Sequence, residues 1–207
     1  MGFITGLMTH RKSSVRQMSS VAETSGNVGG TGEARMRGRI ALPGILLGVG
    51  LGGFVDGILL HQILQWHHML SSSGSANIDI GDYPVTTVHG LEMNTLWDGV
   101  FHTITWLAVL AGLGILYSRV THSRGRLWAS RVLWGWILVG WGVFNVVEGV
   151  IDHHILGIHH VISGEYQGAA DIAFLVLGAV LILVGWLVQR SGRSLDSADR
   201  PERASGR

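Results

Sequence analysis

The chain has 207 residues, of which 47% are hydrophobic and 14% charged, with a mean hydropathy of +0.35. It has no cysteine, which excludes disulfides and thiolate metal sites, and its formal charge of +1 gives no reason to expect a nucleic-acid partner. A bilayer-spanning helix needs about 20 mostly apolar residues. Four segments meet this requirement: about Leu42–Leu64, Thr95–Tyr117, Val132–Leu156 and Ala170–Val188.

Polar segments flank these spans. Residues 1–40 are rich in Ser, Gly and Arg and have no apolar core of a signal peptide, so they are predicted to form a disordered cytoplasmic tail. Met1 and Met18 both remain candidates for the true start. Residues 41–190 are expected to form one transmembrane domain, followed by a second disordered cytoplasmic tail at 191–207.

Basic residues predict the orientation of the spans. Arginines precede the first span, fill the loop between the second and third spans, and follow the fourth span. The loops at about 71–94 and 163–169 contain no Lys or Arg. Because cytoplasmic loops carry an excess of basic residues, both termini should be cytoplasmic and these two loops should face outward.

The chain contains an internal duplication. When residues 45–71 are aligned with 137–163 without a gap, twelve of the 27 positions are identical. The shared pattern is D/E-G-x3-H-x5-H-H, which low-complexity apolar sequence does not produce. We therefore predict two parallel two-helix repeats, about 41–118 and 132–190, related by an axis along the membrane normal. The expected fold is all-α, a polytopic membrane four-helix bundle.

The duplicated residues are candidate metal ligands. An acid near the middle of a bilayer costs about 2.5–3.5 kcal/mol, so two acids that each precede a histidine favour a functional site over interhelical hydrogen bonding. The second span adds an acid and a histidine four residues apart, on one helical face. Imidazole and carboxylate ligands suit iron, zinc, copper(II) or manganese. The candidate ligands are Asp56, His61, His67, His68, Asp98, His102, Glu148, His153, His159 and His160.

A regular α-helix predicts that these ligands lie at different depths. It places His61 about 7.5 Å and His67 about 16 Å along the axis from Asp56. His61, His102 and His153 should therefore converge with at least one of the acids Asp56, Asp98 and Glu148. The four histidines nearer the outer surface are expected to form a second, more exposed site: His67, His68, His159 and His160.

Two resemblances bear on function. The segments "GFVDGILLHQILQWHHML" and "FNVVEGVIDHHILGIHHV" resemble bacterial four-span membrane proteins classified as a domain of unknown function. This resemblance covers about residues 40–190 and implies a multi-pass protein of the bacterial cytoplasmic membrane with no established activity. A looser similarity to the histidine boxes of membrane desaturases and hydroxylases concerns ligand type only, because His154-x4-His159-His160 is not an H-x-x-H-H box.

Three functions are compatible with these residues. The first is a non-haem metallo-oxidoreductase with one or two ions, acting on oxygen or a lipid-soluble substrate together with a membrane redox partner. The second is a metal-handling or metal-delivery protein for a membrane partner. The third is an electron-transfer protein in which His61 and His153 bind one haem, which ranks last because haem ligation has no need of paired acids or doubled histidines.

Overall fold

The computed structural model describes residues 40–122 and 130–198, with side chains for 40–122 and 131–191. The predicted N-terminal tail, the loop residues 123–129 and the end of the C-terminal tail lie outside the described residues. The described residues are helical or irregular and contain no strand. Four helices are long and apolar enough to cross a membrane by length and composition, which confirms the prediction of an all-α, four-span protein.

The spans follow the order of the sequence. The first span, Ile40–Ile63, ends in the π-helical segment η1 (Val55–Ile63), and α2 (Val88–Thr121) follows after a long loop. The third span consists of α3 (Ser130–Glu148) and the π-helical segment η3 (Gly149–Leu156). The fourth is α4 (Gln167–Ala198), which extends into the segment predicted as a polar tail.

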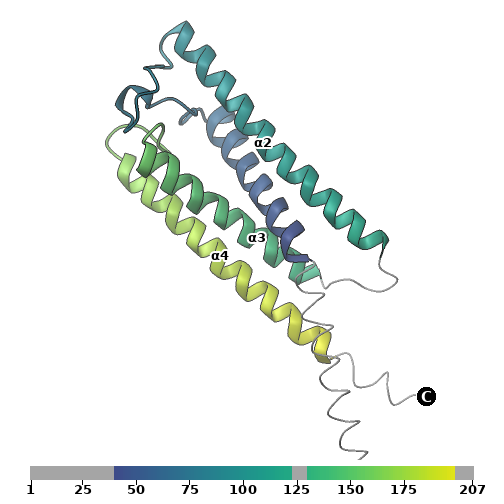
Figure 1. The fold of residues 1–207 in the computed structure, drawn as a ribbon. Coiled ribbons are helices and arrows are strands. Elements are labelled where there is room, and N and C mark those ends of the chain that lie inside the picture. The colour runs from purple at the N-terminus through teal and green to yellow at the C-terminus, as the bar shows by residue number, and fades with distance from the viewer. Residues whose placement is uncertain (1–39, 123–129, 199–207) are drawn as a thin grey trace, which may run out of the picture. The chain divides into compact units, whose positions relative to one another are not determined.

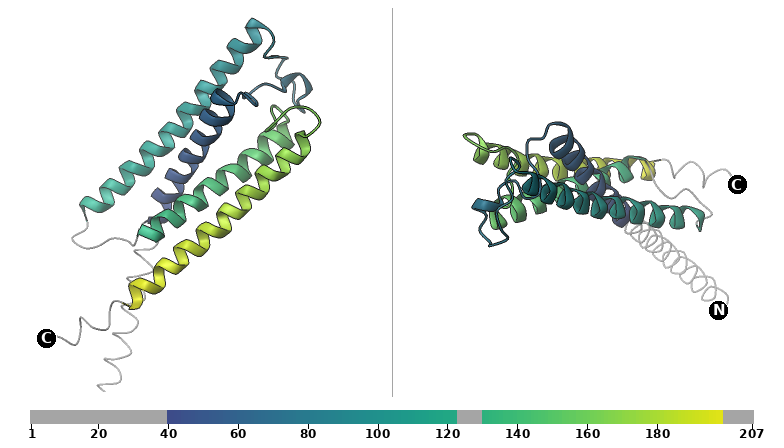
Figure 2. Two further views of the ribbon diagram at one scale, coloured as in Figure 1. Left: turned by 180° about the vertical axis from the view of Figure 1, so that it is seen from behind. Right: turned by 90° about the horizontal axis from the view of Figure 1, so that it is seen from above.

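The first and third spans form the centre of the helical unit, with α2 beside the first span and α4 beside the third (Figures 1 and 2). Glycines bring the central pair close together. A Cβ on Gly48 would lie 2.0 Å from the carbonyl oxygen of Ile137, and one on Gly140 would lie 2.2 Å from that of Ile45. Gly48 and Gly140 occupy equivalent positions in the two repeats, so the repeats meet through the same residue of each.

The flanking helices repeat as well. Gly50 of the first span approaches Val109 of α2, and its equivalent, Gly142, approaches Ile182 of α4. Val109 and Ile182 are 73 residues apart, a different offset from that of the central spans because the loops of the two repeats differ in length. Each repeat is therefore one inner helix with one outer helix packed on it.

The duplicated motif ends each inner helix in the same way. Hydrogen bonding in a π-helix joins residues five apart, so η1 and η3 place each motif acid and the histidine five residues later one turn apart. A left-handed residue then stops the helix: Gln65, with φ of 51°, in the first repeat and Gly157, with φ of 63°, in the second. Beyond this residue the chain leaves the helix, which changes the position of the next two histidines.

Candidate metal centre

Six residues of the duplicated motif gather at the end of the inner helices where the two repeats meet. Each repeat contributes one carboxylate and two imidazoles, and none of the six is more than 6% exposed. Burial of this many ionisable groups in an apolar helical unit is unfavourable unless they bind one another or a cation. The six are Asp56, His61 and His67 from the first repeat and Glu148, His153 and His159 from the second.

In the first repeat, both imidazoles face the Asp56 carboxylate. Nε2 of His61 lies 3.2 Å from Oδ2 of Asp56, and Nε2 of His67 lies 3.9 Å from Oδ1. The η1 segment aligns His61 with Asp56, whereas His67 reaches the acid because the chain turns back after Gln65. Asp56 thus has an imidazole nitrogen near each of its oxygens.

The second repeat has a matching arrangement around Glu148. Nε2 of His153 lies 3.0 Å and Nε2 of His159 lies 2.9 Å from the same oxygen, Oε1. The His159 contact is a hydrogen bond, whereas the His153 contact is not aligned for one. The matched side chains of the two repeats therefore have matching surroundings.

The two halves are in contact through their second histidines. The rings of His67 and His159 stack in parallel, with centroids 5.0 Å apart and an interplanar angle of 4°. Ligand atoms of His61, His67 and His159 all lie within 4.8 Å of one another, as do those of Glu148, His153 and His159. His159 belongs to both groups, so the two candidate ion positions share one imidazole.

The protonation pattern of the first repeat favours a cation. Nδ1 of His61 is hydrogen bonded to Asp98 at 3.0 Å, and Nδ1 of His67 to the carbonyl of Val161 at 3.0 Å. A carboxylate and a carbonyl can only accept, so both Nδ1 atoms carry the proton. Burial lowers the pKa of the His67 imidazole to about 2, so its ring is neutral. In a neutral His67 ring of this tautomer, the Nε2 lone pair is directed at the Asp56 carboxylate, an arrangement that a cation stabilises.

Buried atoms without hydrogen bonds mark the same place. Within the described part of the chain, both Asp56 oxygens and Nε2 of His61 and of His67 lack a hydrogen-bond partner. Buried polar atoms are nearly always satisfied, and a site for an ion is one reason for exceptions. The second repeat adds Oε2 of Glu148, both ring nitrogens of His153 and Nδ1 of His159.

The spacing of these atoms fits metal coordination after small shifts. Metal–nitrogen and metal–oxygen bonds of about 2.0–2.2 Å keep two ligands of one ion within about 4.4 Å of each other. Within each of the two groups (His61, His67 and His159; Glu148, His153 and His159) the ligand atoms lie within 4.8 Å of one another, so these side chains would move by only a few tenths of an ångström. The donor set is nitrogen and oxygen alone, which suits iron, zinc, manganese or copper(II).

The structure does not place the candidate ligands at the two depths that were predicted. The expectation that His67 and His159 lie in a separate, more exposed site is wrong, because the turn after each π-helical segment returns them to the level of His61. His68 and His160 do lie at the rim, half-buried, each bound through Nδ1 to an aspartate.

His102 is not part of either group of ligand atoms. Its Nδ1 donates to the carbonyl of Asp98 on its own helix, and its Nε2 lies close to Gly57. The Asp98 carboxylate faces Nδ1 of His61, on the side of the ring opposite Asp56. Asp98 is thus a partner of a candidate ligand and does not point at the ion position itself.

Sequence reasoning left one acid out of the candidate ligands. Asp171 of α4 lies 3.3 Å from Nδ1 of His153 and 2.8 Å from Nδ1 of His160. Asp98 contacts Nδ1 of His61 and of His68 in the same way. The available signal was Asp-x-x-Phe, shared by Asp98 with Phe101 and by Asp171 with Phe174. These phenylalanines contact His61 and His153, respectively.

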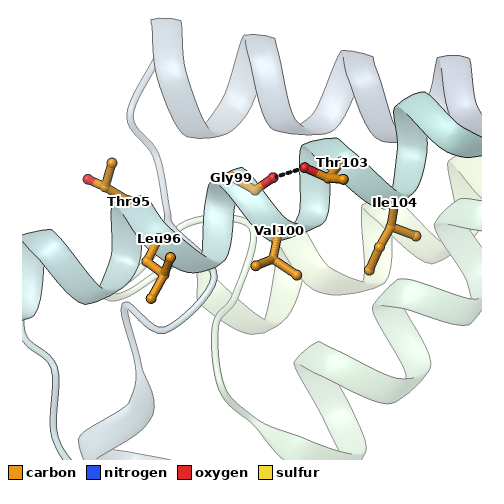
Figure 3. A pocket seen from close by; sticks show the side chains of 6 residues that line it. All are labelled: Thr95, Leu96, Gly99, Val100, Thr103 and Ile104. Carbon is orange, nitrogen blue, oxygen red and sulfur yellow. Dashed lines mark hydrogen bonds between the residues drawn. The ribbon is translucent and has the colours of Figure 1, made fainter.

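A concavity elsewhere on the surface offers different chemistry. An open depression of about 430 Å³ lies on α2 and is lined by apolar and small side chains, including Leu96, Val100 and Ile104 (Figure 3). The hydroxyl of Thr103 donates to the carbonyl of Gly99 on the same helix. The lining thus presents an apolar surface suited to lipid and no ligand set.

Comparison with known proteins identifies a family and no function. No curated protein matches the chain, and no solved structure matches it. The family described as "Predicted membrane protein (DUF2243)" matches residues 43–192, which include both copies of the motif and all four spans except the first three residues of the first. The chain therefore belongs to this family of membrane proteins.

Proposed function

We propose that the chain is a membrane metalloprotein with a binuclear, non-haem centre, formed by one carboxylate and two imidazoles from each repeat. The observation that carries the proposal is the set of buried, unpartnered ligand atoms directed at one another from both repeats. One ion would be bound by Asp56, His61 and His67, and the other by Glu148 and His153, with His159 within reach of both.

The ligand set favours redox chemistry. Two histidines and one carboxylate leave coordination positions open, and this combination is typical of non-haem iron enzymes that react with oxygen. Here it occurs twice, in the interior of a helical unit, as in soluble di-iron carboxylate proteins. We therefore favour a metallo-oxidoreductase that uses oxygen or a lipid-soluble substrate and exchanges electrons with a membrane redox partner.

Transport and haem binding fit the geometry less well. A translocated ion would have to pass between the inner helices, where Gly48 and Gly140 allow backbone to contact backbone. A porphyrin between His61 and His153 would need space that the stacked rings of His67 and His159 occupy, since that pair contacts both of the other histidines. Delivery of an ion to a membrane partner remains the second candidate, because it needs the same buried site and no transmembrane path.

The arginine distribution supports the placement of this centre toward the outer face of a bacterial cytoplasmic membrane, with both termini in the cytoplasm. The motif histidines lie next to the loops that lack Lys and Arg, within residues 64–87 and 157–166. On this orientation, an ion or a small substrate reaches the centre from outside the cytoplasm.

The test is metal analysis of the purified protein together with its absorption spectrum. We expect about two transition-metal ions per chain and no Soret band. Glu148→Gln keeps the shape of the side chain and removes its charge, so it should lower the metal content, while His154→Ala, at an exposed position, should not. A purified protein without metal that also fails to bind added Fe²⁺, Zn²⁺ or Cu²⁺ contradicts the proposal.

A further inference from the structure

Asp98 of α2 is bound by several parts of the first repeat. Its Oδ1 accepts hydrogen bonds from Nδ1 of His61 and from the backbone N–H of Met69, both at 3.0 Å. Its Oδ2 accepts from Nδ1 of His68 at 2.6 Å and from the side-chain amide of Gln62 at 3.2 Å. The carboxylate is 1% exposed, so it has exchanged water for these four donors.

Asp171 of α4 has the same role in the second repeat. Its Oδ1 accepts from the backbone N–H of Val161 at 3.0 Å and lies 3.3 Å from Nδ1 of His153. Its Oδ2 accepts from Nδ1 of His160 at 2.8 Å. Val161 also links the repeats, because its carbonyl accepts the Nδ1 hydrogen of His67.

Each of these acids thus contacts both chain segments that carry ligands. It accepts from, or lies against, the imidazole of the π-helical segment, and so fixes which ring nitrogen faces the motif acid. It also accepts from the backbone N–H two residues after the second histidine, where the chain has turned back toward the centre. One carboxylate from the outer helix can therefore orient two imidazoles of its repeat, the one in the π-helical segment and the one after the turn.

We infer that Asp98 and Asp171 are positioning residues that set the tautomer and orientation of the imidazoles in the metal centre. The inference rests on the proposed function, since it concerns the same centre. Partners that bind the second nitrogen of a metal-bound histidine typically change metal affinity 10–100-fold when they are removed. An acid that only joined helices would affect folding and leave the coordination of a bound ion unchanged.

The test uses the full-length protein in detergent, freed of metal with a chelator and titrated with Co²⁺ alone, whose visible bands report ligand geometry. Asp98→Asn keeps the size of the side chain but cannot accept from His61, Met69 and His68 together. We expect a roughly 10–100-fold loss of affinity for one Co²⁺ ion and a change in its visible spectrum. Asp171→Asn should change the affinity for both ions. Asp171 accepts from the backbone N–H of Val161, and the carbonyl of Val161 accepts from His67 of the other repeat.

Thr105→Val is the matched control. Thr105 is a buried polar residue of the same outer helix as Asp98, and its hydroxyl donates to the carbonyl of His102 within that helix. The Thr105→Val variant should keep the visible spectrum and the Co²⁺ affinity of the parent protein. If Asp98→Asn does not fold, Asp98→Glu is used as the test variant. It retains the charge but displaces the carboxylate, so a positioning role for Asp98 predicts an altered Co²⁺ spectrum.

The outcomes separate the two proposals. A parent protein that binds two Co²⁺ ions and an Asp98→Asn variant with the same affinities and spectrum overturn the inference alone. The same holds if Asp98→Glu, used in place of a misfolded variant, gives the parent spectrum. A parent protein that binds no Co²⁺ overturns the proposed function and the inference with it.

Discussion

Replacement of His159 by alanine should weaken the binding of both metal ions. His159 is fully buried, lies in both groups of ligand atoms, donates to Glu148 through Nε2 and has an unpartnered Nδ1. His153 belongs to only one group. We therefore expect His159→Ala to affect two binding steps and His153→Ala to affect one.

The size of the effect follows from the binding free energy per ligand. A structural zinc ion with four ligands binds with about 10–16 kcal/mol, or about 3 kcal/mol per ligand. Since a tenfold change in affinity corresponds to about 1.4 kcal/mol, loss of one imidazole should weaken binding by a factor of roughly 100 or more. For His159→Ala this factor should apply to each ion.

Calorimetric titration of metal-free protein with Zn²⁺ measures both steps. His154→Ala is the control, because His154 is exposed and its Nδ1 donates to the carbonyl of Gly149 on the same helix. It should retain both affinities. The reasoning is refuted if His159→Ala binds two ions within about threefold of the parent affinities, or if His154→Ala loses as much.

Three further predictions concern orientation, packing and backbone strain. Single cysteines at Ser75 and Ser163, both exposed, should react with a membrane-impermeant maleimide in intact cells; reaction only after permeabilisation would reverse the orientation. Gly140→Val should lower stability by about 1–3 kcal/mol, measured as thermal unfolding in detergent, while Gly114→Val, with nothing within 4 Å, should not. Gln65→Gly should raise stability by about 1 kcal/mol, because the left-handed φ of 51° is unfavourable for glutamine; an unchanged or lower midpoint would contradict this.

The spans could be predicted because apolar length alone defines them. The predicted ends of the first and third spans agree with the structure to within two residues. The second differs most, since α2 begins at Val88, where the side chain of Thr87 caps it by accepting from the N–H of Gly90. That first part of α2 is polar, so hydropathy gives no sign of it.

The position of the ligands depended on local backbone geometry. The prediction assumed a regular α-helix, in which residues five apart do not face each other. The π-helical segments bring His61 to Asp56 and His153 to Glu148, and the left-handed residues after them return His67 and His159 to the same centre. No residue pattern in the motif specifies a π-helix, so spacing alone could not show this.

The outer helices were harder to compare than the inner ones. Twelve identities over 27 positions identify the inner repeat, whereas the outer repeat keeps little beyond an aspartate and a phenylalanine. Its offset of 73 residues also differs from the offset of 92, because the first loop is longer than the third. The short Asp-x-x-Phe pattern was therefore a weak signal, and the contacts of Asp171 with His153 and His160 assign it as the counterpart of Asp98.

The most direct test of the metal centre is anomalous diffraction from crystals of the protein loaded with Zn²⁺. We predict two peaks in the interior of the helical unit, one bound by Asp56, His61 and His67 and the other by Glu148 and His153, with His159 within reach of both. Peaks only at exposed histidines such as His122 or His154, or no peak at all, would contradict the account.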